Sequence, residues 1–104
     1  MPRIAFTMQL FPGCEAEYRH RHATIWPELQ SLLKEAGIRE YSIFLNEKTL
    51  LLFAYLVIDD PANLETIAGH SVMRRWWDRM KDIMESYPDG EPIVRRLDEV
   101  FYLP

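Results

Sequence analysis

The chain has 104 residues, of which 48% are hydrophobic and 27% are charged, and this length and composition predict a single globular domain over residues 1–104. Its 12 basic and 16 acidic side chains give a net charge of −4, which argues against a nucleic-acid-binding surface. The single cysteine, Cys14, excludes an intrachain disulfide and a multi-cysteine zinc site. No apolar run approaches the roughly 18 residues of a membrane span, and no export signal is recognisable. We therefore expect a small cytoplasmic protein, either an enzyme or a binding module.

The first element predicted is a strand over residues 3–10, where apolar side chains recur at every second position. A helix is expected over residues 14–36, with Gly37 as the residue that ends it. Pro27 removes one backbone hydrogen bond and clashes with the preceding turn, so the helix should kink or break just after His22. The break either only bends the helix around the sheet or also opens space and a free carbonyl beside His22.

Four more elements are expected after Gly37. Alternation predicts a strand over residues 39–45, and the apolar run 50–58 predicts a strand buried on both faces. Asp60 and Ser71 are candidate caps of two helices, which end near Gly69 and Glu85. A final strand is expected over residues 93–103.

The order β-α-β-β-α-β is that of a ferredoxin-like α+β fold. Its helices can cover only one face of the sheet, yet residues 50–58 are apolar on both faces. The second face must therefore meet another apolar surface. We expect a homodimer in which two sheets face each other, that is, a dimeric α+β barrel.

Tyr18 and His22 are the first candidate functional pair, because positions four apart share one face of a helix. A histidine can donate and accept protons near neutral pH, and a tyrosine hydroxyl beside it can position a substrate. The alternative is a buried histidine with a purely structural role. His20 lies two positions from His22, which places the two rings on different helix faces and argues against a two-histidine metal site.

Aromatic side chains supply the other candidates. Met73, Trp77, Met80 and Met84 fall at helical spacing, so Trp77 is expected in the core and Trp76 at its edge, where an indole can line a pocket. Tyr41 lies on an apolar strand face, where its hydroxyl needs a partner. Aromatic rings with one histidine suit a neutral polyol that has an apolar flank. No glycine-rich phosphate loop is present in the sequence.

Several segments together resemble the L-rhamnose mutarotase family along nearly the whole chain. The matching segments are residues 18–22 (YRHRH), 25–29 (IWPEL), 41–45 (YSIFL), 75–77 (RWW) and 99–104 (EVFYLP). The resemblance implies a cytoplasmic homodimer that acts in rhamnose catabolism and interconverts the α and β anomers of L-rhamnose without a metal or organic cofactor. By the same resemblance His22 is the proton donor, and the substrate contacts are Tyr18, Tyr41, Trp76 and Trp77. His20 gains no role from it.

Mutarotation requires the sugar ring to open and to close again on the other face of C1. We expect His22 to protonate the ring oxygen, while a tyrosine, a water or another group handles the proton of the anomeric hydroxyl. One alternative is a cofactor-free monooxygenase or haem-degrading protein of the same fold, since fold alone does not decide function. The others are a sugar-binding module without turnover and a pure dimerisation domain.

Overall fold

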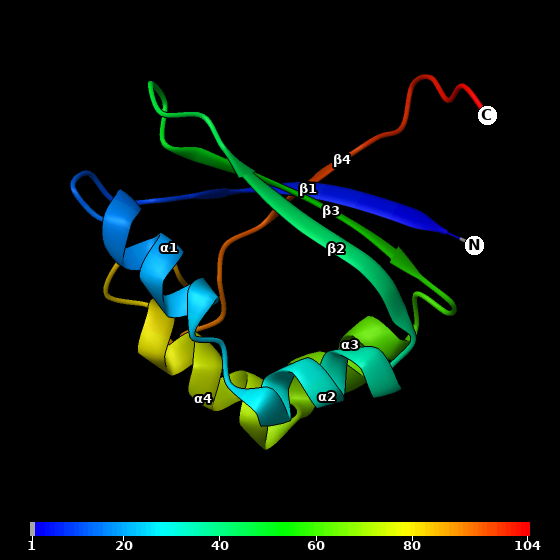
Figure 1. Cartoon of the computed structure of the whole chain (residues 1–104), viewed down its shortest axis with the longest axis horizontal. Coiled ribbons are helices and arrows are strands. Elements are labelled where there is room, and N and C mark those ends of the chain that lie inside the picture. The colour runs from blue at the N-terminus through cyan, green and yellow to red at the C-terminus, as the bar shows by residue number, and fades with distance from the viewer. Residues whose placement is uncertain (1) are drawn as a thin grey trace.

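A computed structural model describes residues 2–104, and it places every helix on one side of a four-stranded sheet (Figure 1). The elements in chain order are β1 (Arg3–Gln9), α1 (Glu15–Ala23), α2 (Pro27–Glu35), β2 (Ile38–Leu45), β3 (Leu51–Ile58), α3 (Asn63–Gly69), α4 (Ser71–Met80) and β4 (Arg95–Leu97). The strand order is β2-β3-β1-β4, and all neighbouring strands are antiparallel. This topology confirms the ferredoxin-like α+β fold, with each of its two helices divided into two segments.

The helix break before Pro27 is confirmed. α1 ends at Ala23 and α2 begins at Pro27, which occupies the first helical position, where a missing N–H costs nothing. The carbonyl of His22 itself accepts a hydrogen bond from the Ile25 N–H at 3.3 Å. Gly37 follows α2 with a φ of +93°, a backbone conformation that favours glycine.

Helix α4 differs from the expectation at both of its ends. The cap of α4 is His70 rather than Ser71, because His70 Nδ1 accepts a hydrogen bond from the Val72 N–H at 3.1 Å. α4 also ends at Met80, five residues before Glu85. Met84 still reaches the core, but it does so from an isolated bridge to Leu10. Met84, which the sequence placed in the helical stripe with Met73 and Met80, therefore belongs to an extended segment after the helix.

The core lies between the helices and the inner face of the sheet. Its largest fully buried side chains are Leu10, Leu29, Leu52, Leu56, Ile58 and Met80. The outer face of the sheet carries no helix (Figure 1), and it leaves large apolar side chains exposed. These are Phe44, Phe53, Tyr55 and Leu97. The prediction that the helices cover only one face is confirmed.

The C-terminal strand is shorter than expected. Only residues 95–97 pair with β1, and residues 98–104 leave the sheet (Figure 1). Arg3 holds this tail at two points, through an ion pair with Glu99 and a guanidinium 3.7 Å from the centre of the Tyr102 ring. The strand predicted over residues 93–103 therefore forms only at residues 95–97, and Val100 and Phe101 beyond it are 94% and 77% exposed.

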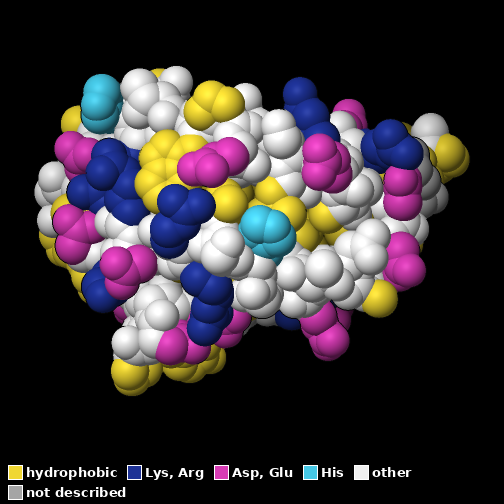
Figure 2. All heavy atoms as spheres, turned by 90° about the horizontal axis from the view of Figure 1, so that it is seen from below, with side chains coloured by type: hydrophobic (Ala, Val, Ile, Leu, Met, Phe, Trp, Pro, Cys, Tyr) yellow, Lys and Arg dark blue, Asp and Glu magenta, His cyan; other side chains and the backbone are white. Residues whose placement is uncertain are grey.

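The outer surface of the helices mixes charges of both signs over most of its area (Figure 2). Of the residues from 2 to 104, none belongs to a helix long and apolar enough to cross a bilayer.

Candidate functional site

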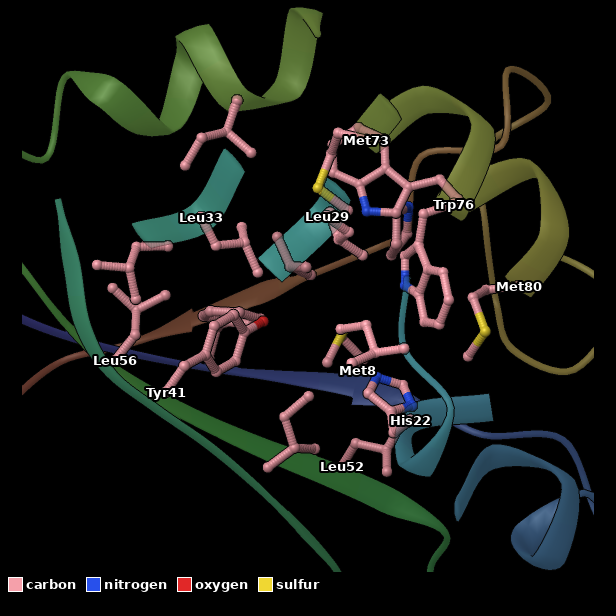
Figure 3. Close-up of a pocket in the computed structure, with 18 of the residues that line it drawn as sticks. Met8, His22, Leu29, Leu33, Tyr41, Leu52, Leu56, Met73, Trp76 and Met80 are labelled. Carbon is pink, nitrogen blue, oxygen red and sulfur yellow. The ribbon is translucent and has the colours of Figure 1, made fainter. Parts of the chain in front are cut away.

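A cavity of about 1250 Å³ lies between the helices and the inner face of the sheet. Helix α1 contributes His22, helix α4 contributes Met73, Trp76 and Met80, and strand β2 contributes Tyr41 (Figure 3). Most of the remaining wall is aliphatic, formed by side chains of α2 and the central strands. The cavity thus combines a few polar groups with a large apolar surface, as binding sites for small molecules do.

The His22 ring is held in one orientation by its own helix. Its Nδ1 lies 3.1 Å from the Tyr18 carbonyl oxygen, which can only accept a hydrogen bond. Nδ1 therefore carries the proton in the neutral ring, and Nε2 keeps a free lone pair. His22 is half-buried, and this burial lowers its pKa, with only partial opposition from the Tyr18 carbonyl. At neutral pH the ring is consequently an uncharged imidazole that can accept a proton at Nε2.

Tyr18 lies directly against His22. The two rings stack with centroids 4.3 Å apart and an angle of 30° between their planes. Tyr18 is 8% exposed, and burial raises the pKa of its hydroxyl, with a further contribution from Tyr41. The hydroxyl therefore stays protonated at physiological pH and can act as a hydrogen-bond donor.

Tyr41 approaches the same cavity from the edge strand β2. The residue is 39% exposed, but its hydroxyl points into the cavity (Figure 3). Burial of this hydroxyl end raises the pKa of Tyr41 to about 12. Tyr18, Tyr41 and His22 thus present two neutral phenols and one neutral imidazole to the cavity.

The two tryptophans exchange the positions that the sequence predicted. Trp76 is 5% exposed and lies edge-on to two rings, 5.5 Å from His22 and 5.2 Å from Trp26 between centroids. Trp77 is only half-buried, with the Arg74 guanidinium 5.4 Å from its ring centre, although it also lines the cavity. The expectation failed because it used Met84 to set the helical stripe, and Met84 lies beyond the end of α4.

All five predicted site residues line this one cavity: Tyr18, His22, Tyr41, Trp76 and Trp77. Tyr18, His22 and Trp76 form a continuous ring cluster, whereas Tyr41 and Trp77 reach the cavity from β2 and from the edge of α4. His20 is exposed and does not line the cavity. In the part of the chain that the structure describes, no cluster of three or more His, Cys, Asp and Glu side chains could hold a metal ion.

Two residues near the site were missed at the level of sequence. Trp26 packs on Trp76 from the break between α1 and α2. Glu15 lines the cavity from the first turn of α1. The spacing of Glu15 from Tyr18 and His22, three and seven positions, could have indicated that all three share a helix face. No pattern of spacing predicts the contact of Trp26, because it depends on the angle of the break.

Comparison with known proteins identifies the family. The sequence profile of the L-rhamnose mutarotase family matches residues 3–103. The chain belongs to this family. An L-rhamnose mutarotase from Jannaschia sp. (strain CCS1) is 50% identical over 104 residues, which is the full length of both chains.

Solved structures agree with this assignment. The crystal structure of an L-rhamnose mutarotase from Formosa agariphila superposes on the chain with a TM-score of 0.93, with 41% identity and complete coverage of both chains. An antibiotic biosynthesis monooxygenase has a TM-score of 0.53 and 13% identity, over 96% of this chain and 99% of its own. The second similarity extends to the fold alone. Monooxygenases share the architecture of this family without close sequence similarity to the chain.

Proposed function

We propose that this protein interconverts the α and β anomers of L-rhamnose. The observation that carries the proposal is the ring cluster of Tyr18, His22 and Trp76 inside the cavity of a chain from this family. An imidazole with a free lone pair, a phenol that remains protonated and an aromatic wall are the groups that anomer exchange of a neutral sugar requires.

In the order of proton transfers that we propose, His22 acts first as a base. Nε2 takes the proton of the anomeric hydroxyl, the bond between C1 and the ring oxygen breaks, and the ring oxygen receives a proton from the Tyr18 hydroxyl. After rotation about the bond between C1 and C2, the steps reverse. Tyr18 recovers its proton as the ring oxygen attacks C1, and the imidazolium of His22 donates its proton to the carbonyl oxygen.

The donor role that the family resemblance implies for His22 is the second half of this cycle. The alternative order starts from a protonated His22 that donates to the ring oxygen. The lowered pKa of His22 favours the first order at neutral pH, because only a minor fraction of the enzyme carries the imidazolium. Each step transfers a proton or opens or closes the C1–O bond of the ring without a net oxidation or reduction, so the route requires no metal or organic cofactor, and we expect a chelator to leave the rate unchanged.

Tyr41, Trp76 and Trp77 are proposed to bind the sugar. Aromatic faces contact the C–H side of a pyranose, and phenol hydroxyls can donate to or accept from its hydroxyl groups. The aliphatic wall suits the methyl group at C6 of a deoxysugar. A module that binds the sugar without turnover remains the second candidate, since the same aromatic wall would serve it.

We further propose that the protein is a homodimer formed through the outer face of the sheet. Phe44, Phe53, Tyr55 and Leu97 lie exposed on this face, and an exposed apolar surface of this kind is typical of an interface. The exposed apolar side chains of residues 100–103 continue it. Sedimentation should give twice the monomer mass at micromolar concentration, and a stable monomer would contradict the proposal. A cytoplasmic role in rhamnose catabolism is proposed from the family resemblance.

The direct test of the activity is saturation-transfer NMR of L-rhamnose, which measures exchange between the two anomer signals. The wild-type protein should accelerate exchange, and His22→Ala should lose about 10²–10⁴-fold of that acceleration, the usual contribution of general acid–base catalysis. His20→Ala is the matched control, because this histidine is exposed on the same helix. Broadening of the sugar signals without exchange would favour the binding module, and equal rates for wild type and His22→Ala would exclude His22 as the proton carrier.

A further inference from the structure

The turn of residues 86–92 forms part of the cavity wall beside α4. Three of its residues line the cavity: Tyr87, Glu91 and Pro92. The Tyr87 N–H donates to the Glu91 carbonyl at 2.8 Å, so the turn closes on itself. It lies outside the helices and the four-stranded sheet, and its position against the rest of the wall therefore depends on other contacts.

Gly90 brings this turn against the backbone of α4. Its φ is +94°, a conformation that favours glycine, and a Cβ added to it would lie 3.7 Å from both the nitrogen and the Cα of Asp78. Asp78 directly follows Trp77, which lines the cavity as well. The turn and the tryptophan are therefore adjacent parts of one wall.

Arg74 connects these two parts of the wall. Its Nη2 donates to Asp89 Oδ2 at 3.0 Å, and its Nη1 lies 3.7 Å from Glu91 Oε1. Its guanidinium also lies 5.4 Å from the centre of the Trp77 ring, three positions further along α4. One side chain thus contacts both acids that flank Gly90 and the neighbouring tryptophan.

The contacts of Arg74 suit a role in geometry more than in stability. The carboxylates of Asp89 and Glu91 are both partly exposed, and exposed ion pairs contribute little to stability. The planar guanidinium, however, holds its acceptors at fixed angles, which an ammonium group cannot do. Arg74 itself does not line the cavity, so it can influence the contents only through the residues that it contacts.

We propose that Arg74 is a positioning residue, which fixes the Trp77 ring and the 86–92 turn together as one wall of the sugar site. This inference rests on the proposed function, in which Trp77 contacts the sugar. By limiting the orientations of the ring and the turn before the sugar arrives, Arg74 reduces the freedom that is lost on binding. Its removal should therefore weaken binding and leave the proton transfers at His22 unaffected.

The experiment measures kcat and KM for anomer exchange of L-rhamnose by Arg74→Met. KM should rise roughly 3- to 10-fold, the loss expected when one or two side chains must be ordered on binding, and kcat should stay within about twofold. Arg74→Lys keeps the charge without the planar fork and should give an intermediate KM. Lys81→Met is the matched control and should keep the wild-type KM. Lys81 also pairs with a carboxylate of α4, that of Asp78 at 2.6 Å, and neither residue lines the cavity.

A double-mutant cycle tests the route through Trp77. If Arg74 orients this ring, Arg74→Met should raise KM by a smaller factor in a Trp77→Ala background than in wild type. Equal factors in the two backgrounds would overturn the proposal. Asp89→Asn tests the route through the turn, because it keeps an acceptor for the Glu91 N–H but removes the charge that faces Arg74. It should produce part of the increase in KM that Arg74→Met produces.

The outcomes separate this inference from the proposed activity. A wild-type KM in Arg74→Met, or a fall in kcat without a rise in KM, would overturn the role of Arg74 while the activity stands. Circular dichroism identifies a loss that comes from unfolding, and Arg74→Lys and Asp89→Asn then decide through their KM. If wild type binds L-rhamnose without exchanging its anomers, the proposed activity fails, and NMR titration tests Arg74 through Kd with the same expected ratios. A wild type that does not bind L-rhamnose would overturn both proposals.

Discussion

Helices α1 and α4 form neighbouring walls of the site and are held in place by different forces. α1 has one buried residue, Tyr18, and most of its other residues are charged or polar. α4 buries Val72, Met73, Trp76 and Met80 in the core. The connection between them is largely polar, because Arg21 of α1 donates to both carboxylate oxygens of Asp82, at 2.8 and 3.2 Å, and to the Arg79 carbonyl at 2.7 Å.

This difference shows how the site divides its tasks. Directional hydrogen bonds hold α1, so the orientation of His22 depends on a few atoms and can be set precisely by them. Packing holds α4, so Trp76 belongs to the core as well as to the site. A change on α4 should therefore reduce stability first, whereas a change on α1 should reduce the rate first.

The largest expected effect is the loss of stability when each of the two tryptophans of α4 is truncated. Trp76→Ala should lower the free energy of unfolding by about 3–5 kcal/mol, because it opens a cavity in the core. Trp77→Ala should cost about 1–2 kcal/mol, since its ring is only half-buried. Urea unfolding followed by circular dichroism measures both values. Equal losses would show that the two rings contribute alike to the core.

To test whether Trp76 contributes to sugar binding, a substitution is needed that destabilises the core less than Trp76→Ala does. Trp76→Phe keeps an aromatic ring in contact with His22 and Trp26 and should raise KM for the sugar with a smaller loss of stability. The Trp77→Ala variant provides the comparison for a ring at the edge of the cavity.

Removal of the Arg21 hydrogen bonds that connect α1 to α4 should cost less stability than truncation of Trp76. Arg21→Met should lower the free energy of unfolding by about 1–2 kcal/mol, because it leaves partly exposed acceptors that water can reach. It should also lower kcat several-fold with little change in KM, as α1 no longer holds His22 at a fixed distance from α4. Rates measured well below the unfolding temperature separate the two effects.

Arg19→Met is the matched control on the same helix. Arg19 meets Glu47 at 3.4 Å, and both side chains are mostly exposed, so the change should cost less than about 0.5 kcal/mol. Because Arg19 also lines the cavity, this variant is a control for stability and not for kcat. An Arg21→Met variant with the kcat of wild type would show that packing alone positions α1.

Sequence periodicity was sufficient for much of this architecture. Alternation located the strands around Phe6 and Ile43, and the clash caused by Pro27 located the break between α1 and α2. Helical spacing brought Tyr18 and His22 together, because positions four apart must meet on any regular helix. These inferences depend only on local geometry, which the sequence encodes directly.

Features that depend on tertiary contacts could not be predicted from sequence periodicity. Trp76 and Trp77 both fit the stripe of Met73 and Met80. The end of α4, which decides between them, depends on how residues after Met80 pair with Leu10, just beyond β1. His70 caps α4 through a ring nitrogen, although the sequence favoured Ser71. The short pairing of β4 likewise depends on contacts beyond the strand itself.

Of the expected effects, the change of rate with pH near neutrality is the smallest. Its direction tests the role of His22 on α1, the helix that hydrogen bonds hold in place. Burial lowers the pKa of His22 below its ordinary value, so the neutral ring predominates at pH 7. If Nε2 acts as the base, kcat/KM, which reports the pKa of the free enzyme, should be constant between pH 7 and 8 and should decline as the pH falls through the lowered pKa. If a protonated His22 starts the reaction, kcat/KM should instead rise as the pH falls from 8 to that pKa. Exchange rates between pH 5 and 8, compared with those of His22→Ala and corrected for the uncatalysed reaction, distinguish the two orders. A rate that rises as the pH falls would mean that the hydrogen bond from Nδ1 to the Tyr18 carbonyl orients His22 as a proton donor and not as a base.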